Sequence, residues 1–498
     1  MAMIDISHLT FAHDGGDNLF DDVSFRLDTD WKLGFTGRNG RGKTTFLRLL
    51  RGELPYGGRI TTPGGLRYVT FPPTVDDALA DRPALDVLRT LAPEAEEWRF
   101  WCEAGLLGLD EAVFDRPWRI LSGGERTKLA LSLLFVDDSA SFALIDEPTN
   151  HLDRAGRAAV SEYLRGKRGF IVVSHDRDFL DGCVDHILSI NRTNIEIEQG
   201  NFSSWWAGKQ ARDAAELAEA EQHRREARRL EEAARRSAEW ASSAERAKGE
   251  RNGGLRPDRG FVGHKAAKAM KRAKNIESRL LAEAEARRAL GQNVEESEAL
   301  KLSPIDYPVR RLLTLDGVQV CYDSAPVSEP VSLTVERGEK IALRGTNGCG
   351  KSSLLRLICG EALDYRGTMN RPDRLRISYV GQETGHLRGL PEDYARDAGI
   401  EVSRFLMLLR KLDFSRDQLA RPIEQFSEGQ KKKVLLARSL GEQAHLYVWD
   451  EPLNYIDVLS RMQLEELLRG SDATMLFVEH DAAFCDAVAT REVWMARA

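Results

Sequence analysis

The sequence predicts an α/β fold in two homologous halves that are joined by a long antiparallel α-helical hairpin. Four motifs of the first half recur in the same order in the second half, at nearly constant offsets of 304–308 residues. That period is far too long for a solenoid and indicates two copies of one domain. The composition between the copies changes to that of a helical linker. We expect a first repeat at residues 1–199, a linker at 200–305 and a second repeat at 306–498.

Composition restricts the class of protein. A chain of 498 residues is long enough for about three domains. It contains no run of about 18 apolar residues, which a membrane-spanning helix would need. The start lacks the basic and apolar regions of a signal peptide. The six cysteines are scattered without a C-x-x-C pair, which argues against disulfide frameworks, zinc ribbons and iron–sulfur clusters. We expect a cytoplasmic protein with no membrane segment.

The linker combines helix-forming composition with a local positive charge. Residues 210–301 are rich in Ala, Glu, Arg and Lys and are interrupted once by glycines and Pro257. This predicts two long antiparallel helices, the first of about 40 residues, with a tip at about 251–263. Residues 246–279 hold 11 Lys/Arg against 3 Asp/Glu, although the chain has a net charge of −7. A contact with a polyanion is favoured over an inert spacer.

Each repeat contains a phosphate-binding loop of the pattern G-x-x-x-x-G-K-[ST]. The loops, "GRNGRGKTT" and "GTNGCGKSS", each follow a short apolar strand and open an apolar helix. In this context the backbone N–H groups wrap the phosphates, the lysine reaches the outer phosphates and the hydroxyl binds Mg²⁺. The residues expected to bind ATP here are Gly37, Arg38, Asn39, Gly40, Arg41, Gly42, Lys43, Thr44, Thr45, Gly345, Thr346, Asn347, Gly348, Cys349, Gly350, Lys351, Ser352 and Ser353.

The runs "ALIDE" and "YVWDE" read as buried strands that end in Asp-Glu. The aspartates are placed to hold Mg²⁺, and the adjacent Glu147 and Glu451 could polarise the attacking water. His175 and His480 follow later apolar strands, from which they could contact a γ-phosphate. The predicted Mg²⁺ ligands are Thr44, Asp146, Ser352, Gln382 and Asp450.

The segments "LSGGERTK" and "FSEGQKKK" resemble the signature motif of ATP-binding-cassette (ABC) ATPases. The resemblance implies two tandem ABC-type P-loop ATPase domains, joined by the hairpin and arranged head to tail around two ATP molecules, in a monomeric Mg²⁺-dependent ATPase. It also implies that each signature caps the γ-phosphate bound by the opposite domain. Phe11 and Tyr322 stand where an adenine-stacking residue normally lies, with core packing as the alternative. The signature residues are Ser122, Gly123, Gly124, Glu125, Ser427, Gly429 and Gln430.

Two departures from the family pattern predict unequal ATP sites. The second repeat keeps a glutamine, Gln382, in "ISYVGQE", whereas the first repeat has Pro73 in "YVTFPPT". Proline has no side-chain amide and no backbone N–H. The second signature carries Glu428 in place of a glycine. Both departures fall in the composite site of the first phosphate loop. We therefore expect the site of Lys351, Gln382 and Glu451 to be the better hydrolase.

The arrangement of the motifs distinguishes between several kinds of ABC protein. A transporter subunit is less favoured, because the two domains are fused through a long charged hairpin. The DNA-repair and chromosome-organising ATPases insert their coil inside one cassette, whereas both cassettes are intact here. The ribosome-recycling branch should carry a cysteine-rich iron–sulfur domain, and no such motif is present. The segment "IEQGNFSSWWAGK" is similar to a hallmark of the ABC-F family at the start of the linker.

Within ABC-F, the compact layout resembles antibiotic-resistance proteins of the Lsa/Vga type, most nearly the Lsa group. The resemblance implies binding at the tRNA exit site of the bacterial ribosome, with the tip toward large-subunit rRNA, the P-site tRNA and the peptidyl-transferase centre. It implies resistance to lincosamides, streptogramin A and pleuromutilins by ribosomal protection. The alternative is a general ABC-F translation factor that relieves stalled ribosomes. The tip residues expected to contact RNA or the drug site are Arg251, Arg256, Pro257, Arg259, Phe261, Lys265, Lys268, Lys271 and Arg272.

Overall fold

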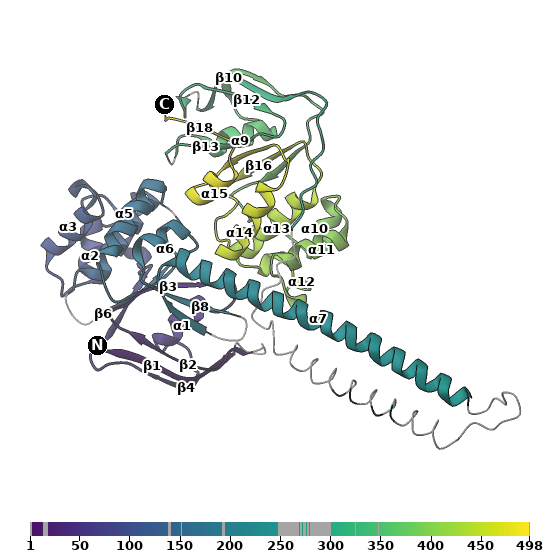
Figure 1. Cartoon of the computed structure of the whole chain (residues 1–498). Helices are drawn as coiled ribbons and strands as arrows, with labels where there is room; N and C mark the ends of the chain where they lie inside the picture. Colours follow the sequence, from purple (N-terminus) through teal and green to yellow (C-terminus); the bar gives the residue numbers. More distant parts are fainter. Residues whose placement is uncertain are drawn as a thin grey trace, which may run out of the picture. The chain divides into compact units, whose positions relative to one another are not determined.

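The computed structural model describes most of the chain, and the chain forms two compact units (Figure 1). The described residues are 2–12, 18–137, 141–150, 152–191, 195–247, 268, 271, 275, 278, 300–323, 325–346 and 348–497. The larger unit comprises Met1–Ile190, Asn194–Ser203 and Ser297–Ala498, and the smaller one Asn191–Thr193 and Ser204–Glu296. Both repeats therefore belong to the larger unit.

The first repeat contains two sheets. Its strands are β1 (Met3–Ala12), β2 (Asn18–Asp28), β3 (Lys32–Gly37), β4 (Gly57–Thr61), β5 (Arg67–Phe71), β6 (Ser141–Asp146), β7 (Phe170–Val173), β8 (His186–Ile190) and β9 (Ile195–Gln199). The larger sheet has the order β5-β6-β7-β3-β8-β9, in which β9 is antiparallel to β8 and the other neighbours are parallel. The antiparallel sheet has the order β2-β1-β4.

Helices and 3-10 turns lie between several of these strands. They are α1 (Lys43–Leu50), α2 (Ala84–Leu91), α3 (Glu97–Leu106), α4 (Gly123–Ser132), α5 (Arg154–Arg165) and α6 (Arg177–Cys183), with 3-10 turns η1 (Asp77–Leu79), η2 (Glu111–Val113), η3 (Trp118–Ile120) and η4 (Leu133–Phe135). Aspartate caps fix where the later helices begin. Asp153 accepts a hydrogen bond from the backbone N–H of Gly156, and Asp176 accepts one from that of Phe179. Such caps satisfy amide groups that have no partner within the helix.

The second repeat copies this arrangement. Its strands are β10 (Arg311–Tyr322), β11 (Ala325–Pro326), β12 (Val331–Glu336), β13 (Lys340–Arg344), β14 (Tyr365–Asn370), β15 (Ile377–Val380), β16 (Leu446–Asp450), β17 (Met475–Val478) and β18 (Arg491–Trp494). Its parallel sheet has the order β15-β16-β17-β13-β18, which matches β5-β6-β7-β3-β8. In the antiparallel sheet β10 pairs with β11, β12 and β14. The predicted α/β fold in two homologous halves is confirmed.

The helices of the second repeat are α9 (Lys351–Cys359), α10 (Pro391–Asp397), α11 (Val402–Lys411), α12 (Arg416–Leu419), α13 (Glu428–Gly441), α14 (Val458–Arg469) and α15 (Ala482–Val488), with the 3-10 turn η5 (Ile423–Gln425). Strand β16 shows how the core is divided. Tyr447 and Trp449 belong to one hydrophobic cluster and Val448 to another, so successive side chains enter opposite faces of the sheet. Both faces are buried: the face of Tyr447 and Trp449 packs against helices, and the face of Val448 packs against α9 and the antiparallel strands β10 and β12.

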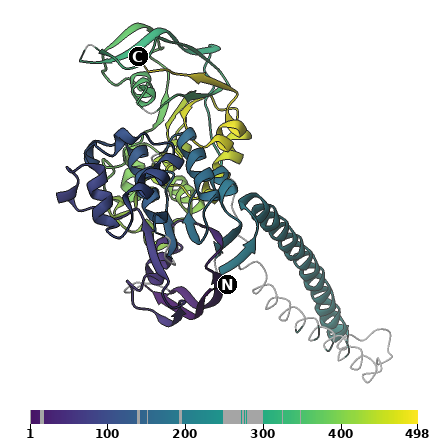
Figure 2. The same cartoon turned by 90° about the vertical axis from the view of Figure 1, so that its left-hand side faces the viewer.

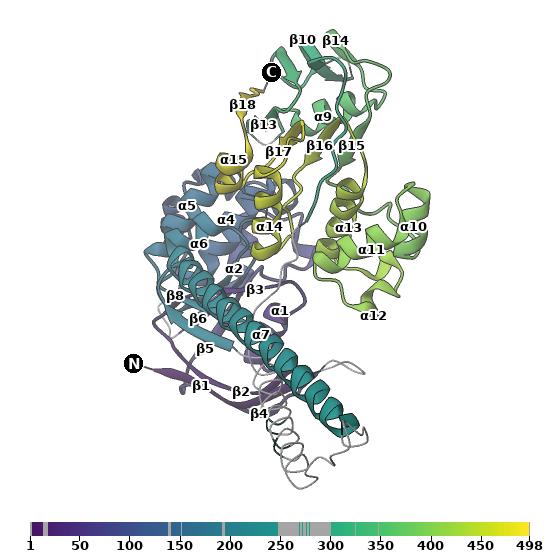
Figure 3. The ribbon, with the colours of Figure 1, turned by 45° about the vertical axis from the view of Figure 1, so that its right-hand side comes forward.

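The linker begins with one long helix. Helix α7 runs from Phe202 to Ala247, 46 residues, and is a continuous ribbon in Figures 2 and 3. The first predicted linker helix is therefore present. Lys268 and Lys271 are exposed helical residues, and the rest of the predicted second helix and the tip lies almost entirely outside the described residues. Within the described part of the chain, no helix is both long and apolar enough to cross a membrane.

Candidate nucleotide-binding sites

The two phosphate loops join a strand to a helix in the same way. Gly42 and Gly350 immediately precede α1 and α9 with left-handed φ angles of 91° and 89°. Glycine adopts this conformation without strain. A Cβ atom on Gly42 would stand 2.6 Å from the side chain of Leu19, so that position also lacks room for a side chain.

Each loop lysine contacts carbonyl groups of its own loop. The Nζ atom of Lys43 donates to the carbonyls of Gly37 at 2.7 Å and Arg38 at 3.1 Å. Lys351 donates to the carbonyls of Gly345 and Thr346, each at 2.9 Å. Burial lowers the pKa of Lys43, although nearby carboxylates act in the opposite direction. Both ammonium groups are therefore held beside the helix N-termini, where a phosphate would be attracted.

The predicted Mg²⁺ ligands converge in both repeats. Thr44 donates from its hydroxyl to Asp146 at 2.8 Å, and Ser352 donates to Asp450 at 3.2 Å. The Gln382 amide donates to the Ser352 hydroxyl at 3.2 Å. Burial raises the pKa of Asp146, and it raises that of Asp450 to about 6. Buried carboxylates beside hydroxyl oxygens fit Mg²⁺, which prefers oxygen ligands and would relieve the cost of burying the charge.

Strand register identifies the position that corresponds to Gln382. Phe71 pairs with Ile145 in the first repeat, and Val380 pairs with Trp449 in the second. Ile145 and Trp449 directly precede the equivalent aspartates of the two repeats, so Phe71 and Val380 are equivalent as well. Pro73 and Gln382 each follow two residues later and therefore occupy the same position.

The two predicted general bases differ in their surroundings. Both follow a strand in a left-handed backbone conformation, with φ of 51° for Glu147 and 48° for Glu451. This conformation is strained for a residue with a side chain and is typical of functional sites. Glu147 Oε1 lies 3.1 Å from His175 Nε2 but accepts no hydrogen bond. Glu451 Oε1 lies 3.6 Å from His480 Nε2, and the Asn454 amide donates to Glu451 Oε2 at 2.6 Å.

These surroundings shift the two pKa values in opposite directions. Burial raises the pKa of Glu147 to about 8, and the nearby Asp146 carboxylate raises it further. Burial also acts to raise the pKa of Glu451, but the interactions with His480 and Asn454 outweigh it and the net pKa is lowered. Burial holds the pKa of His175 well below its usual value. The lowered pKa keeps Glu451 ionised at neutral pH, whereas the Glu147 carboxyl is harder to ionise.

Two cavities, each of about 440 Å³, contain these groups and are lined by both repeats. Site 1 is the cavity of the first phosphate loop; it is lined by Lys43, Asp146 and Glu147 together with Ser427 and Gly429. Site 2 is the cavity of the second phosphate loop; it is lined by Lys351, Gln382 and Glu451 together with Gly123 and Asn150. In site 1 the Asn39 amide donates to the carbonyl of Tyr455 at 2.7 Å. The expected composite arrangement is therefore present in the structure.

The signature segments, residues 122–125 and 427–430, begin helices α4 and α13. The Ser122 and Glu125 side chains form a reciprocal capping box, as do those of Ser427 and Gln430. Arg116 also holds Glu125 through two hydrogen bonds of 2.9 Å, which lower the pKa of that carboxyl to about 2. Glu125 and Gln430 thus fix the helix starts rather than pointing to the opposite loop.

The proposed adenine-stacking residues lie in different environments. Phe11 is 7% exposed and belongs to the hydrophobic core, so the structure favours core packing for it. Tyr322 is 43% exposed, and its hydroxyl shares a hydrogen bond of 3.0 Å with that of Ser353, next to the second phosphate loop. The predicted residues that lie outside the described part are Asn347, Arg251, Arg256, Pro257, Arg259, Phe261, Lys265 and Arg272.

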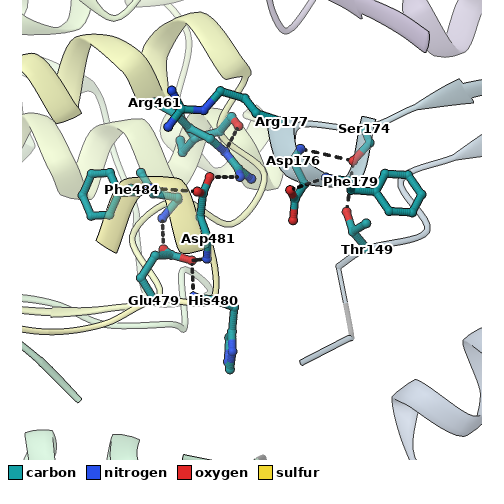
Figure 4. A network of polar contacts seen from close by, with 12 residues as sticks. Thr149, Ser174, Asp176, Arg177, Phe179, Arg461, Glu479, His480, Asp481 and Phe484 are labelled. Atoms are coloured by element: carbon teal, nitrogen blue, oxygen red, sulfur yellow. Dashed lines mark hydrogen bonds and ion pairs between the residues drawn. The ribbon is translucent and has the colours of Figure 1, made fainter. Parts of the chain in front are cut away.

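Several charged residues lie where the two repeats meet (Figure 4). They were not among the predicted site residues. Arg157 pairs with Asp176 at 2.8 Å, and the equivalent Arg461 pairs with Asp481 at 3.2 Å. Arg177 crosses to Glu465 at 2.6 Å. The first two pairs recur at the offset of the repeat, so alignment of the two halves could have identified them. Neither partner of the Arg177–Glu465 pair has a charged counterpart, so no such signal existed for it.

The chain is similar to known proteins along most of its length. The family model described as "ABC transporter" matches residues 20–150 and 328–454, just over half of the chain. The chain is 29% identical to ATP-binding protein Uup of Caulobacter vibrioides, with 96% of this chain and 75% of that protein covered. It is 28% identical to ribosome protection protein VmlR of Bacillus subtilis, with 91% and 80% covered.

A solved structure shares the fold of the chain. It is described as the complex of archaeal ribosomal stalk protein aP1 and archaeal ribosome recycling factor aABCE1. The TM-score is 0.61 at 20% identity, and the match covers 96% of this chain and 87% of that chain. At this identity the likeness concerns the fold alone.

Proposed function

The chain belongs to the ABC transporter family through two ATP-binding domains, and from this premise we propose that it is an ABC-F-type ATPase that binds the bacterial ribosome. Hydrolysis of ATP with Mg²⁺ is the activity of the family. The observation that supports a paired ATPase is that each cavity combines a phosphate loop of one repeat with a signature segment of the other. Binding of ATP would therefore hold the two repeats together.

Individual residues have distinct roles in this proposal. Lys43 and Lys351 neutralise the outer phosphates, and the signature serines complete each site from the opposite repeat. When bound, Mg²⁺ would be held by Ser352, Asp450 and Gln382 in site 2 and would neutralise phosphate charge. Glu451, ionised at neutral pH, accepts a proton from the attacking water.

Three observations support a ribosomal partner. A relative named for ribosome protection matches 91% of the chain. The linker between the two repeats starts with the 46-residue helix α7. The sequence beyond it, residues 246–279, carries 11 basic against 3 acidic residues, a charge suited to RNA phosphates. In the cytoplasm, the ATP-bound form would occupy the tRNA exit site and extend the tip toward the P-site tRNA and the peptidyl-transferase centre.

We expect the Glu147→Gln/Glu451→Gln variant to co-sediment with ribosomes in the presence of ATP, because it binds ATP but cannot release it by hydrolysis. The matched control is Lys43→Ala/Lys351→Ala, which should stay in the supernatant since it lacks the phosphate-binding ammonium groups. The measurement is the fraction of protein that pellets with purified bacterial ribosomes. Equal pelleting of the two variants would contradict the proposal.

The finer proposal is resistance to lincosamides, streptogramin A and pleuromutilins by ribosomal protection. Expression in a drug-sensitive bacterium should raise tolerance to lincomycin, virginiamycin M and tiamulin, and the Lys43→Ala/Lys351→Ala variant should not. Alanine at Arg256 and Arg259 in the tip should reduce both ribosome binding and tolerance. Ribosome binding without any gain in tolerance would favour a general translation factor that relieves stalled ribosomes.

A further inference from the structure

In the second repeat, one helix and one loop serve different ATP sites. Helix α13 starts with the signature segment, whose Ser427 and Gly429 line site 1. The Gln382 loop, residues 381–384, follows β15 and brings Gln382 into site 2. A contact between α13 and this loop therefore joins the two sites through a single repeat.

Two such contacts lie on either side of Gln382. The Thr384 hydroxyl donates a hydrogen bond to Glu428 Oε2 in the first turn of α13. One turn further along the helix, Lys432 Nζ donates to the Gly381 carbonyl at 2.9 Å and to the Asp450 carbonyl at 3.3 Å. Lys432 is 2% exposed. Together the two contacts fix the Gln382 loop to the start of the signature helix.

The buried Lys432 ammonium has compensating charges. Burial lowers its pKa, and the carboxylates of Asp450, Glu479 and Glu451 act against that change. Glu479 itself accepts hydrogen bonds from the backbone N–H groups of Leu453 at 3.1 Å and His480 at 2.7 Å. The charged network thus extends from the signature helix to the segments that carry Glu451 and His480.

The first repeat lacks every part of this connection. The counterparts of Glu428, Lys432 and Thr384 are Gly123, Thr127 and Val75, none of which can form either contact. A cavity of about 1010 Å³ lies there instead, lined by residues that include Pro72, Pro73, Thr127 and Glu147. The two repeats therefore differ in the residue types at these positions, and not only in how the side chains are oriented.

We propose that Glu428 and Lys432 are positioning residues that couple ATP binding at site 1 to ATP binding at site 2. When nucleotide engages Gln382, the loop holds α13 in the orientation that presents Ser427 and Gly429 to site 1. The connection lies in the second repeat alone, but the coupling is reciprocal because a binding free energy links both sites equally. The inference rests on the two-site ATPase of the proposed function and does not depend on the ribosome.

The coupling is measurable by equilibrium dialysis of radiolabelled ATP in the hydrolysis-blocked Glu147→Gln/Glu451→Gln protein. Adding Lys351→Ala gives the affinity of site 1 alone, and adding Lys43→Ala gives that of site 2 alone. The overall association constant for binding two ATP molecules is measured in the protein with both sites intact. Dividing it by the product of the two single-site association constants gives the coupling factor. We expect a factor of about 5 to 150, the usual range for coupled sites. Thr384→Val or Lys432→Met should bring the factor close to one.

Matched variants separate coupling from folding. Glu428→Gln keeps an acceptor for Thr384 and should retain the coupling, whereas Glu428→Ala should lose it. Thr127→Val, at the first-repeat counterpart of Lys432, should leave the factor unchanged. If Lys432→Met does not fold, Thr384→Val and Glu428→Ala test the inference. A wild-type coupling factor in folded Thr384→Val and Glu428→Ala would overturn the inference. Ribosome co-sedimentation of the same variants reports separately on the proposed function.

Discussion

Glu451→Gln is expected to lower steady-state ATP turnover by about 10²–10⁴-fold, the contribution of a positioned general base, whereas Glu147→Gln lowers it only slightly. Glutamine is a neutral isostere of a protonated carboxylic acid. Because the pKa of Glu147 is raised and Pro73 stands where site 2 has Gln382, this substitution is expected to change turnover much less. The pKa of Glu451 is lowered, so the same substitution there removes an ionised base. Gln382 serves only the site that contains Glu451.

The pH dependence provides an independent check. A group with a pKa of about 8 becomes ionised as the pH rises through that value. The residual turnover of Glu451→Gln should therefore increase between about pH 7 and 9, as Glu147 acquires its charge. The control is Glu147→Gln/Glu451→Gln, which should show no such increase. Equal losses of turnover in the two single variants would rule out unequal sites.

Lys433→Met is expected to reduce the free energy of unfolding by about 3–5 kcal/mol, because it leaves a buried charge without its partner. Lys433 Nζ lies 2.7 Å from Asp457 Oδ2, and their side chains are 4% and 0% exposed. Asp457 also accepts a hydrogen bond from the backbone N–H of Ser460 and so starts helix α14. The measurement is chemical denaturation followed by tryptophan fluorescence, to which the buried Trp449 of strand β16 contributes.

A matched control exists in the first repeat. Lys128 is the counterpart of Lys433, and the described structure contains no ion pair between Lys128 and Asp153. Lys128→Met should therefore reduce the free energy of unfolding much less than Lys433→Met does. Lys433→Met/Asp457→Asn should recover part of the loss, because no buried charge remains unpaired. A small effect of Lys433→Met would contradict the assignment of this pair as a main source of stability.

The same pair predicts a loss of stability in acid. The pKa of Asp457 lies far below its usual value, although burial alone would raise it, because Lys433 compensates and hydrogen bonds add to this. A depressed folded-state pKa stabilises the fold fully above the unfolded value of about 3.9, and this contribution is lost progressively as the pH falls from that value toward the folded-state pKa. The stability difference between wild type and Lys433→Met should therefore narrow as the pH is lowered below about 4.

Much of the fold and of each phosphate loop could be predicted because the information is local. The spacing from Gly37 to Lys43 predicts one turn between a strand and a helix. The apolar runs before Asp146 and Asp450 predict buried strands. The composition after residue 210 predicted a helix, and α7 is one. In contrast, Phe11 was proposed to stack on adenine from its position in the motif order, but packing decides its environment and buries it in the core.

The asymmetry of the two glutamates could only partly be predicted, because it depends on contacts between distant segments. Both repeats have the same Asp-Glu-Pro run, with an asparagine three residues after the glutamate. Asn454 donates to its glutamate, whereas among the described residues no such bond joins Asn150 to Glu147; both asparagines line the cavity of site 2. The crossing contacts Asn39 to Tyr455 and Arg177 to Glu465 are likewise set by how the repeats face each other. The spacing of residues along the sequence does not give the distance between segments of different repeats.

Lys432 and Glu479 have Thr127 and Ser174 as their counterparts, so two interior positions differ together between the halves. Replacing Lys432 by threonine alone would remove the nearby cation from the buried Glu479 carboxylate, and replacing Glu479 by serine alone would remove an anion that compensates the buried ammonium. The two positions are therefore coupled: exchanging both for the residues of the first repeat is expected to cost less free energy of unfolding than the sum of the two single exchanges.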